Sequence, residues 1–470
     1  MKNVQLPEAY VRQMQALLGR EEAERFLDSY NDARAFGLRI NPLKCRQLIG
    51  DNAAAALKQP FHLEPVPWCK TGYYYEESTR PGKHPYHTAG LYYIQEPSAM
   101  SAAELLDAQP GETILDFAAA PGGKTTQIAG SMNGEGLLIA NEIHPARAKI
   151  LSENVERLGI RNAVVTNAAP QELSKRFPAF FDRIMLDSPC SGEGMFRKDE
   201  LAITEWSEEH VTYCAARSAD ILEHAAIMLK PGGVLVYSTC TFNRSENEDT
   251  IEQFIVSHPS FHVEQIERLW PHQVRGEGHF VARLRKAADE DLLKVGHIDE
   301  PDLRSSKNKR RERDKRSARQ AKPLTAELAL WSSFAEQALP GFTLGAGEPI
   351  RFGDALYWLP HQSNGSFGAA DLDGLKVARP GLHLGDIRKN RLEPAHALAL
   401  AVQSEEAAWV QNYPPDSPEI AAYLRGETLP AIGDVNGWGL VAVDGLPLGW
   451  AKASSGQLKN HLPKGLRRFS

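Results

Sequence analysis

Residues 112–129 read ETILDFAAAPGGKTTQIA and join an apolar run to a glycine-rich turn and a helical pattern. The apolar run, Thr113 to Phe117, carries one acidic residue, Asp116, and the helical pattern begins at Lys124 after Pro-Gly-Gly. A buried strand, a tight loop and a helix N-terminus in this order form the unit on which α/β proteins bind nucleotide-like ligands. The stretch therefore predicts a parallel sheet with a ligand site at this loop.

Three kinds of ligand compete for the loop. A phosphate-binding loop needs Gly-x-x-x-x-Gly-Lys-Ser/Thr, and Ala118 stands where the first glycine is required. The dinucleotide fingerprint Gly-x-Gly-x-x-Gly is absent. S-adenosylmethionine (SAM) remains, because it has no phosphate and fits a loop of small residues. Glu142 ends the next predicted strand, where an acidic group accepts ribose hydroxyls. These features favour a SAM-dependent methyltransferase over a loop that serves packing alone.

Alternating strand and helix patterns continue from residue 96 to residue 286 and predict a Rossmann-like, doubly wound α/β sheet. FHVEQIE and GHFVARL follow without a helix between them, so an antiparallel hairpin is expected at the edge. The length of the chain suggests about three domains. We expect an N-terminal lobe at 1–95, the catalytic domain at 96–286, a basic linker at 287–325, a first C-terminal domain at 326–400 and a small β-barrel at 401–470 with a hairpin turn at Asp444-Gly445.

The composition restricts the class of protein. There is no apolar run long enough to cross a membrane and no signal pattern, so a cytoplasmic protein without membrane contact is expected. The five cysteines include no C-x-x-C pair, which argues against a disulfide framework and predicts no metal site. The net charge of the chain is −7, but the segment from Arg304 to Lys322 has a net charge of +8 and the segment after Trp450 has a net charge of +5. Concentrated basic charge of this kind is typical of a nucleic-acid contact.

Two stretches of the N-terminal lobe allow different interpretations. FGLRINPLK predicts a short strand whose polar members are Arg39 and Asn41. The following segment, WCKTGYYYEESTRPGKHPYHTAGLYYIQEPSAM, is rich in Tyr, His, Pro and Gly. Its aromatic rings could stack on RNA bases beside Arg80 and Lys83, or they could form a packed loop over the catalytic domain. The sequence leaves both interpretations open.

Two cysteines stand at neighbouring strand ends. Asp187, Pro189 and Cys190 follow the fourth predicted strand of the catalytic domain, and Cys240 ends the fifth. Neighbouring strand ends of a doubly wound sheet open into one cleft, so both thiols should face the methyl donor. A thiolate that adds to C6 of a pyrimidine makes C5 nucleophilic enough to take a methyl group. Asp187 is expected to hydrogen-bond and protonate N3. The alternative is a pair of buried structural cysteines.

ILDFAAAPGGKTTQIA, LDSPCSGEGMFRK and YSTCTFNRSENE resemble the motifs of the NOL/NOP/Sun family of RNA cytosine-C5 methyltransferases. FGLRINPLK, PGKHPYHTAGLYYIQEPSAM and the tail from GWGLV to LKNHLPKGLRR are similar to its bacterial RsmF branch, which modifies 16S ribosomal RNA. The resemblance implies Cys240 as nucleophile, Cys190 as base or release residue, and Asp187 as a contact of both SAM and cytosine. It implies a SAM site made of Ala118, Ala119, Ala120, Pro121, Gly122, Gly123, Lys124, Glu142 and Asp187.

The same resemblance implies ribosomal RNA of the small subunit, or its precursor, as the partner of a chain that we expect to be monomeric. The N-terminal lobe and a PUA-like C-terminal domain would bind it through Arg39, Asn41, Lys198, Lys452, Lys459, Lys464 and Arg467. One departure concerns Ala169, because the family often has Asp there for the adenine amine; Asn167 or a main-chain carbonyl could replace it. Two rivals are a transfer-RNA cytosine-C5 methyltransferase and a catalytically idle RNA-binding assembly factor.

Overall fold

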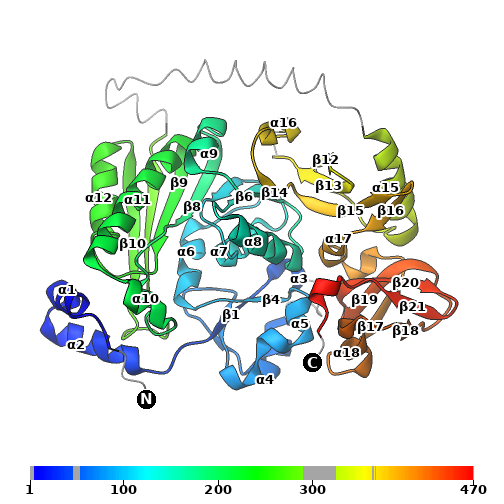
Figure 1. Cartoon of the computed structure of the whole chain (residues 1–470), viewed down its shortest axis with the longest axis horizontal. Helices are drawn as coiled ribbons and strands as arrows, with labels where there is room; N and C mark the ends of the chain where they lie inside the picture. The colour runs from blue at the N-terminus through cyan, green and yellow to red at the C-terminus, as the bar shows by residue number, and fades with distance from the viewer. Residues whose placement is uncertain (1–4, 46–52, 289–323, 363–364, 366, 469–470) are drawn as a thin grey trace.

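A computed structural model describes residues 5–45, 53–288, 324–362, 365 and 367–468 of the chain. Figure 1 shows a blue N-terminal lobe beneath a cyan-to-green α/β region, with the yellow-to-red C-terminal part along one side. The predicted basic linker at 287–325 lies almost wholly outside the described residues.

The central sheet has eight strands in the order β10-β11-β9-β8-β5-β6-β7-β14. The five inner strands run parallel, whereas β10, β11 and β14 are antiparallel to their neighbours. The predicted doubly wound sheet with an antiparallel hairpin at its edge is therefore confirmed. The strand bounds are β5 Thr113–Asp116, β6 Leu137–Asn141, β7 Ala163–Thr166, β8 Phe181–Asp187, β9 Leu229–Thr239, β10 Phe261–Leu269, β11 His279–Lys286 and β14 Val377–Arg379.

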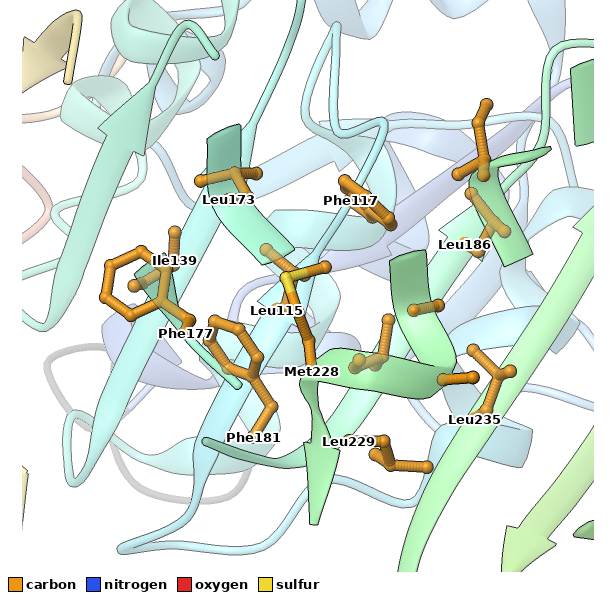
Figure 2. Packing of buried hydrophobic residues seen from close by; sticks show 14 of the residues in the cluster. Leu115, Phe117, Ile139, Leu173, Phe177, Phe181, Leu186, Met228, Leu229 and Leu235 are labelled. Carbon is orange, nitrogen blue, oxygen red and sulfur yellow. The ribbon is translucent and has the colours of Figure 1, made fainter. Parts of the chain in front are cut away.

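Helices cover both faces of this sheet, which explains why its strands are apolar on both sides. Leu115 packs into the cluster on one face and the preceding Ile114 into the cluster on the other, as the alternation of a strand requires. Figure 2 shows the first cluster, where Phe177 and Phe181 lie close to Ile139. The helices on the first face are α9 Pro170–Arg176, α11 Glu208–Met228 and α12 Glu248–Ser257, and those on the second are α6 Ser101–Leu106, α7 Gly123–Met132 and α8 Pro145–Arg157.

The first two helices of the N-terminal lobe pack against the catalytic domain. Its helices α1 (Glu8–Leu18) and α2 (Arg20–Asp28) pack Tyr10 and Phe26 against Phe242 and other buried aromatic rings of the catalytic domain. Its sheet has the order β2-β3-β1-β4, and β1 confirms the strand predicted in FGLRINPLK. The remaining bounds are β1 Gly37–Ile40, α3 Pro42–Cys45, α4 Ala53–Phe61, β2 Glu64–Pro65, β3 Gly72–Tyr74, α5 Pro85–Thr88 and β4 Tyr92–Ile94.

The segment after the linker is joined to the catalytic sheet. Its strand β14 pairs with β7, and the buried Arg379 of β14 forms an ion pair of 3.0 Å with the half-buried Glu156 of α8. Its own sheet has the order β12-β13-β15-β16. Nothing in the sequence indicated that a strand so far along the chain completes the catalytic sheet. The bounds are α15 Thr325–Ala338, β12 Gly347–Phe352, β13 Ala355–Pro360, α16 Ala369–Leu372, β15 Leu382–Arg388, β16 Arg391–Pro394 and α17 His396–Ala401.

The C-terminal region forms a five-stranded sheet in the order β17-β19-β20-β21-β18. The predicted hairpin is confirmed, since β19 and β20 are antiparallel and meet at Asp444-Gly445. Among the described residues, no helix is both long enough and apolar enough to cross a bilayer. The bounds are β17 Val410–Tyr413, α18 Pro418–Arg425, β18 Leu429–Pro430, β19 Gly437–Val443, β20 Leu446–Ser454 and β21 Gln457–Asn460.

This C-terminal sheet shares one hydrophobic cluster with the N-terminal lobe. The aromatic-rich stretch of the lobe forms the contact: Tyr86 donates its hydroxyl to the carboxylate of Asp444, and Arg468 donates to the Lys83 carbonyl oxygen at 2.6 Å. Burial lowers the pKa of His84 to about 4 and that of His87 to about 3, so both rings are neutral at pH 7. The structure thus favours a packed stretch over base stacking, and these contacts are with the C-terminal sheet, which the interpretation of a loop over the catalytic domain did not include.

Candidate active site

The loop between β5 and α7 is held tightly at both ends. Gly122 adopts φ +115°, a left-handed conformation that favours glycine. A Cβ at Gly123 would lie 3.2 Å from the Gln95 amide nitrogen, so the loop also approaches the N-terminal lobe closely. Thr125 of α7 donates its hydroxyl to Asp116 at the end of β5, which fixes the helix N-terminus against the strand. Burial raises the pKa of Asp116 to about 7.

A cavity of about 250 Å³ opens beside this loop. Glu142 lies in its wall with 3% of its surface exposed. Its Oε1 accepts a hydrogen bond from the His144 main-chain N–H at 2.9 Å, and its Oε2 lies 3.4 Å from Arg147 Nη1. Arg147 also donates to the carbonyl oxygen of Ala120 at 2.7 Å. The predicted loop residue Ala118 also lines the cavity, with Phe117, Asn141, Ile143, Pro170, Gln171, Pro189, Arg217, Asp220 and Ile221.

The residues of this cavity fit SAM. Phe117, Ile143 and Ile221 give apolar walls for an adenine ring. An ionised carboxylate has about four acceptor sites, and the contacts of Glu142 with His144 and Arg147 leave acceptor capacity for ribose hydroxyls. In this cavity SAM would be held by Glu142 and Ala118, and it would supply an electrophilic methyl group. Contacts with the rest of the predicted loop, 119–124, which does not line the cavity, stay a prediction.

The polar residues after β7 hold the neighbouring strand end. Asn167 Nδ2 donates to the carbonyl oxygens of Glu142 at 2.7 Å and Ile143 at 2.8 Å. Ala169 caps α9, and its main-chain N–H donates to Glu172 Oε2 at 2.9 Å. Asn167 therefore supports the loop that carries Glu142. Its Nδ2 is used in these two bonds, so Asn167 could accept from the adenine amine only through Oδ1; a main-chain carbonyl is the other predicted acceptor.

Asp187 at the end of β8 is the centre of a charged group. Lys124 Nζ lies 2.8 Å from its Oδ2, and Ser238 Oγ donates to its Oδ1 at 2.8 Å. Burial acts to raise the pKa of Asp187, but the charge of Lys124, with smaller contributions from the hydrogen bonds of Lys124 and Ser238, holds it below its usual value. Asp187 is therefore a carboxylate at neutral pH. The lowered pKa argues against Asp187 as the acid that protonates N3 of a pyrimidine.

The two predicted catalytic cysteines lie together. Cys190 Sγ and Cys240 Sγ are 3.4 Å apart and both are free thiols, since the sulfur atoms of a disulfide bond lie much closer together. The hydrogen bond to Cys240, followed by burial, raises the pKa of Cys190 well above its ordinary value. Cys190 therefore keeps its proton at neutral pH, and its sulfur lies within hydrogen-bond distance of the Cys240 sulfur. The convergence of the strand ends thus brings the two thiols together, and their orientation towards the methyl donor stays a prediction.

A buried network that the sequence analysis missed joins the two cysteine loops. Glu246 accepts hydrogen bonds from the Ser191 main-chain N–H at 2.8 Å, the Ser191 hydroxyl at 2.6 Å and Asn243 Nδ2 at 2.9 Å. Burial raises its pKa to about 6. The acid-rich end of YSTCTFNRSENE, directly after Cys240, was the available signal. Glu246 thereby links the residue after Cys190 to the loop after Cys240.

Two of the predicted RNA contacts are internal. Arg39 is 1% exposed; its Nη2 donates to Thr126 Oγ1 at 2.7 Å and to the Gly123 carbonyl oxygen at 2.9 Å. Asn41 is 2% exposed, and its Nδ2 donates to the carbonyl oxygens of Gly90 and Leu158. The expectation that these two side chains contact RNA is therefore wrong. They fasten the N-terminal lobe to the cofactor loop and to α8, a contact between distant segments that a single sequence does not reveal.

The other predicted RNA contacts remain accessible to different degrees. Lys452, Lys459 and Lys464 are exposed on the C-terminal sheet and the segment after it, and Lys452 Nζ lies 5.4 Å above the Trp438 ring. Lys198 is half-buried near Glu96, and its charge acts to lower the pKa of that carboxyl. Arg467 is half-buried and donates to the Leu462 carbonyl oxygen at 3.2 Å.

A larger cavity of about 490 Å³ lies at the other ends of β6 and β7. Lys44 and Arg161 in its wall donate to the carbonyl oxygens of Leu400 and Ala401, which end α17. These cations therefore serve a helix C-terminus, and the cavity is remote from the thiols. No group of three or more His, Cys, Asp or Glu side chains that could hold a metal ion occurs in the described part of the chain.

Four family models match successive parts of the chain. They are the N-terminal domain of 16S rRNA methyltransferase RsmF (residues 6–97), 16S rRNA methyltransferase RsmB/F (103–285), the RsmF rRNA methyltransferase first C-terminal domain (333–402) and the methyltransferase RsmF PUA domain (410–468). Ribosomal RNA small subunit methyltransferase F of Shewanella amazonensis is 34% identical over 92% of this chain and 91% of its own. The chain belongs to the ribosomal RNA small subunit methyltransferase F family. The Vibrio vulnificus protein of the family is 32% identical over 99% of this chain and 98% of its own.

Solved structures share the fold of this methyltransferase F family member. A methyltransferase homolog protein from Pyrococcus horikoshii, 28% identical, superposes with a TM-score of 0.52 over 60% of this chain and 96% of its own. NSun6 from Pyrococcus horikoshii with SFG, 22% identical, gives a TM-score of 0.54 over 60% and 99%. The chain is thus a SAM-dependent methyltransferase with a Rossmann-like catalytic domain and a C-terminal PUA domain, and its cofactor is SAM.

Proposed function

We propose that this protein transfers the methyl group of SAM to C5 of a cytosine in 16S ribosomal RNA through a covalent bond between Cys240 and C6 of the base. The observation that carries the proposal is the pair of sulfur atoms 3.4 Å apart at the ends of two neighbouring strands, beside the carboxylate of Asp187. A methyltransferase for an exocyclic amine has no need of a thiol, because the amine already has a lone pair.

Cys240 Sγ begins the reaction by adding to C6. The new S–C6 bond uses the electrons of the C5–C6 double bond and makes C5 nucleophilic. Cys190 Sγ supports the attack by donating its S–H to the Cys240 sulfur before the bond forms. C5 then forms its bond to the methyl carbon.

Release requires loss of the C5 proton and breakage of the bond between C6 and Cys240 Sγ, whose electrons return to the sulfur. We assign this step to Cys190, the sulfur next to Cys240. Cys190 first gives up its own S–H proton to solvent, and its thiolate then takes the C5 proton. The raised pKa of Cys190 makes that thiolate a strong proton acceptor. Cys240 and Cys190 thus act in successive steps.

Asp187 and Lys124 supply the charges around the base. The carboxylate of Asp187 is an acceptor, so it suits the exocyclic 4-amino group of cytosine, which donates. Lys124 lies 2.8 Å from Asp187, and we assign to it the balance of the negative charge that enters the pyrimidine ring. A uracil offers a carbonyl oxygen where cytosine has the amine, and a carboxylate there repels it.

The ribosomal substrate is supported by the family and by the basic C-terminal region. Ribosomal RNA small subunit methyltransferase F is the name of the relatives that match nearly end to end. We assign RNA backbone contacts to Lys452, Lys459 and Lys464, which are exposed, and to Lys198 and Arg467, which are half-buried. We expect a cytoplasmic monomer acting on the small-subunit RNA or its precursor.

Bisulfite mapping tests this function. Ribosomal and transfer RNA from cells with and without the gene should differ at one or more cytosines of 16S RNA only. Purified protein with SAM should restore protection of that cytosine from conversion on naked 16S RNA or on the assembled subunit. Protection only in transfer RNA would make it a transfer-RNA enzyme, and no protected cytosine in either RNA would support an assembly factor without catalysis.

A further inference from the structure

His279, the first residue of β11, is a buried side chain without a partner beside the proposed catalytic group. It is 3% exposed, and neither Nδ1 nor Nε2 has a hydrogen-bond partner among the described residues. A buried polar group without a partner is costly, so a native protein rarely keeps one without a reason. The mechanism above gives His279 no role.

The sheet places His279 next to the catalytic residues. Its neighbour Phe280 pairs with Thr239, the residue before Cys240, so the start of β11 lies alongside the end of β9. His279 Nε2 is 3.9 Å from Asp187 Oδ1, just beyond hydrogen-bond distance. A small movement of either side chain would close this gap.

His279 is neutral at physiological pH. Burial, and then the charge of Lys124, lowers its pKa to about 4, although Asp187 and Glu96 act in the opposite direction. These three side chains are the charged groups that face it, from α7, β8 and the segment before α6. A neutral imidazole has one N–H donor and one acceptor nitrogen. His279 can therefore donate to a carboxylate without bringing another positive charge.

The reaction changes the charges around Asp187. In the resting site Lys124 balances Asp187, and His279 contributes no charge. Attack by the Cys240 thiolate brings a negative charge into the pyrimidine ring, and Lys124 is the cation beside it. When Lys124 turns to the ring, Asp187 keeps only Ser238 as a side-chain donor among the described residues. An ionised carboxylate that loses a donor is destabilised, although less in the partly exposed site of Asp187 than in a fully buried one.

We propose that His279 is a positioning residue that donates Nε2–H to Asp187 while Lys124 turns towards the negative charge on the base, an inference that rests on the proposed cytosine-C5 reaction. His279 thereby keeps Asp187 ionised and oriented on the 4-amino group during the attack by Cys240. It does not touch the reacting atoms.

Two substitutions test this role. His279→Phe keeps a planar ring and removes both nitrogens, whereas His279→Gln keeps an amide N–H near the place of Nε2. The His279→Phe enzyme should lose about 10- to 100-fold in kcat, the effect of one hydrogen bond to a charged group, with KM for RNA and Kd for SAM changed less than about twofold. His279→Gln should recover most of this loss. Single-turnover methylation of 16S RNA and calorimetric titration with SAM give these values.

The pH profile gives a second readout that a packing role would not move. Removing a donor to a carboxylate raises the pKa of that carboxylate. The acid limb of kcat should therefore shift to higher pH for His279→Phe and stay at the wild-type position for His279→Gln. Cys240, Asp116, Glu246, Lys124 and Glu96 are the same in all three proteins, so a difference between the His279→Phe and His279→Gln profiles reports the loss of the donor.

Several outcomes would overturn the inference. A His279→Phe enzyme with wild-type kcat and acid limb would show that Asp187 needs no such donor. Equal losses in the Phe and Gln variants, together with lowered melting temperatures, would make His279 a packing residue. Either result with a wild-type protein that methylates C5 of cytosine overturns the role of His279 alone. A wild-type protein that makes no 5-methylcytosine overturns the proposed function itself.

Discussion

Replacement of Glu142 by Gln should weaken SAM binding without disturbing the fold. The carboxylate is 3% exposed in the wall of the 250 Å³ cavity, and the His144 N–H and Arg147 already use part of its acceptor capacity. Gln has the same shape but exchanges one acceptor oxygen for a donor group. Either a ribose hydroxyl or one of these two protein donors then loses its acceptor. A hydrogen bond to a charged group contributes about 1.5–3 kcal/mol, so Kd for SAM should rise about 10- to 100-fold.

Calorimetric titration of the RNA-free protein with SAM measures this change. Glu153→Gln is the matched control, because Glu153 lies on α8 with its side chain 62% exposed, and it pairs only with Lys149, at 3.9 Å, among the described residues. The control should bind SAM with the wild-type Kd. Equal Kd values for the wild type and Glu142→Gln would refute the assignment of Glu142 to the ribose. A lower melting temperature for Glu142→Gln alone would show instead that its bonds to the main chain matter for folding.

Two further predictions concern charges at the site and on the C-terminal sheet. Lys124→Met should lower the free energy of unfolding by about 1–3 kcal/mol at pH 7. This value lies between those of exposed and buried ion pairs, since Lys124 is buried whereas the Asp187 side chain is partly exposed to solvent. Lys124 holds the pKa of Asp187 low against the effect of burial, so this difference should exist above about pH 4 and vanish as the pH falls through the folded pKa of Asp187. Urea unfolding across this pH range measures it, and Lys149→Met, on a side chain 80% exposed, should show neither effect. Joint replacement of Lys452, Lys459 and Lys464 by Ala should reduce the slope of log K for RNA against log salt by about 2–3, roughly 0.7–0.9 per phosphate contact. Filter binding at several salt concentrations measures the slope, and an unchanged slope would mean that these lysines do not contact phosphate.

Substitution is a better test of the C-terminal region than truncation. Its strands share a hydrophobic cluster with the N-terminal lobe, in which Val441 and Leu448 belong to the same group as Leu38 and Tyr92. Removing the region would expose that surface and damage the lobe as well. A loss of RNA binding after truncation would therefore not identify the residues that bind RNA.

Local sequence patterns predicted the catalytic sheet and the two thiols because each rests on a short stretch. The strand–loop–helix at 112–129 and the two cysteines at strand ends need only the rule that parallel strand ends meet at one edge. The structure brings Cys190 and Cys240 within 3.4 Å, as that rule requires. The hairpin at Asp444-Gly445 follows equally from local turn chemistry.

Contacts between distant segments could not be predicted in this way. Arg39 is of a residue type that often contacts RNA. Its guanidinium instead donates hydrogen bonds to Gln95, Gly123 and Thr126, which lie on parts of the chain that only the fold brings together. In the sequence, nothing distinguishes His279 from other strand residues. It lies beside Asp187 because β11 pairs with β9 in the sheet. A single sequence gives the residue type of such side chains and not their partners.

Trapping of the covalent intermediate tests the central claim most directly. The thiolate of Cys240 must add to C6 before methyl transfer, and Cys190 acts at release. Cys190→Ala should therefore attack and transfer the methyl group but fail to eliminate, so that a protein–RNA adduct accumulates on a denaturing gel. Cys240→Ala should give neither adduct nor 5-methylcytosine, and the double variant should give no adduct. An adduct from Cys240→Ala and none from Cys190→Ala would reverse the two roles, and full activity of both single variants would contradict the covalent mechanism.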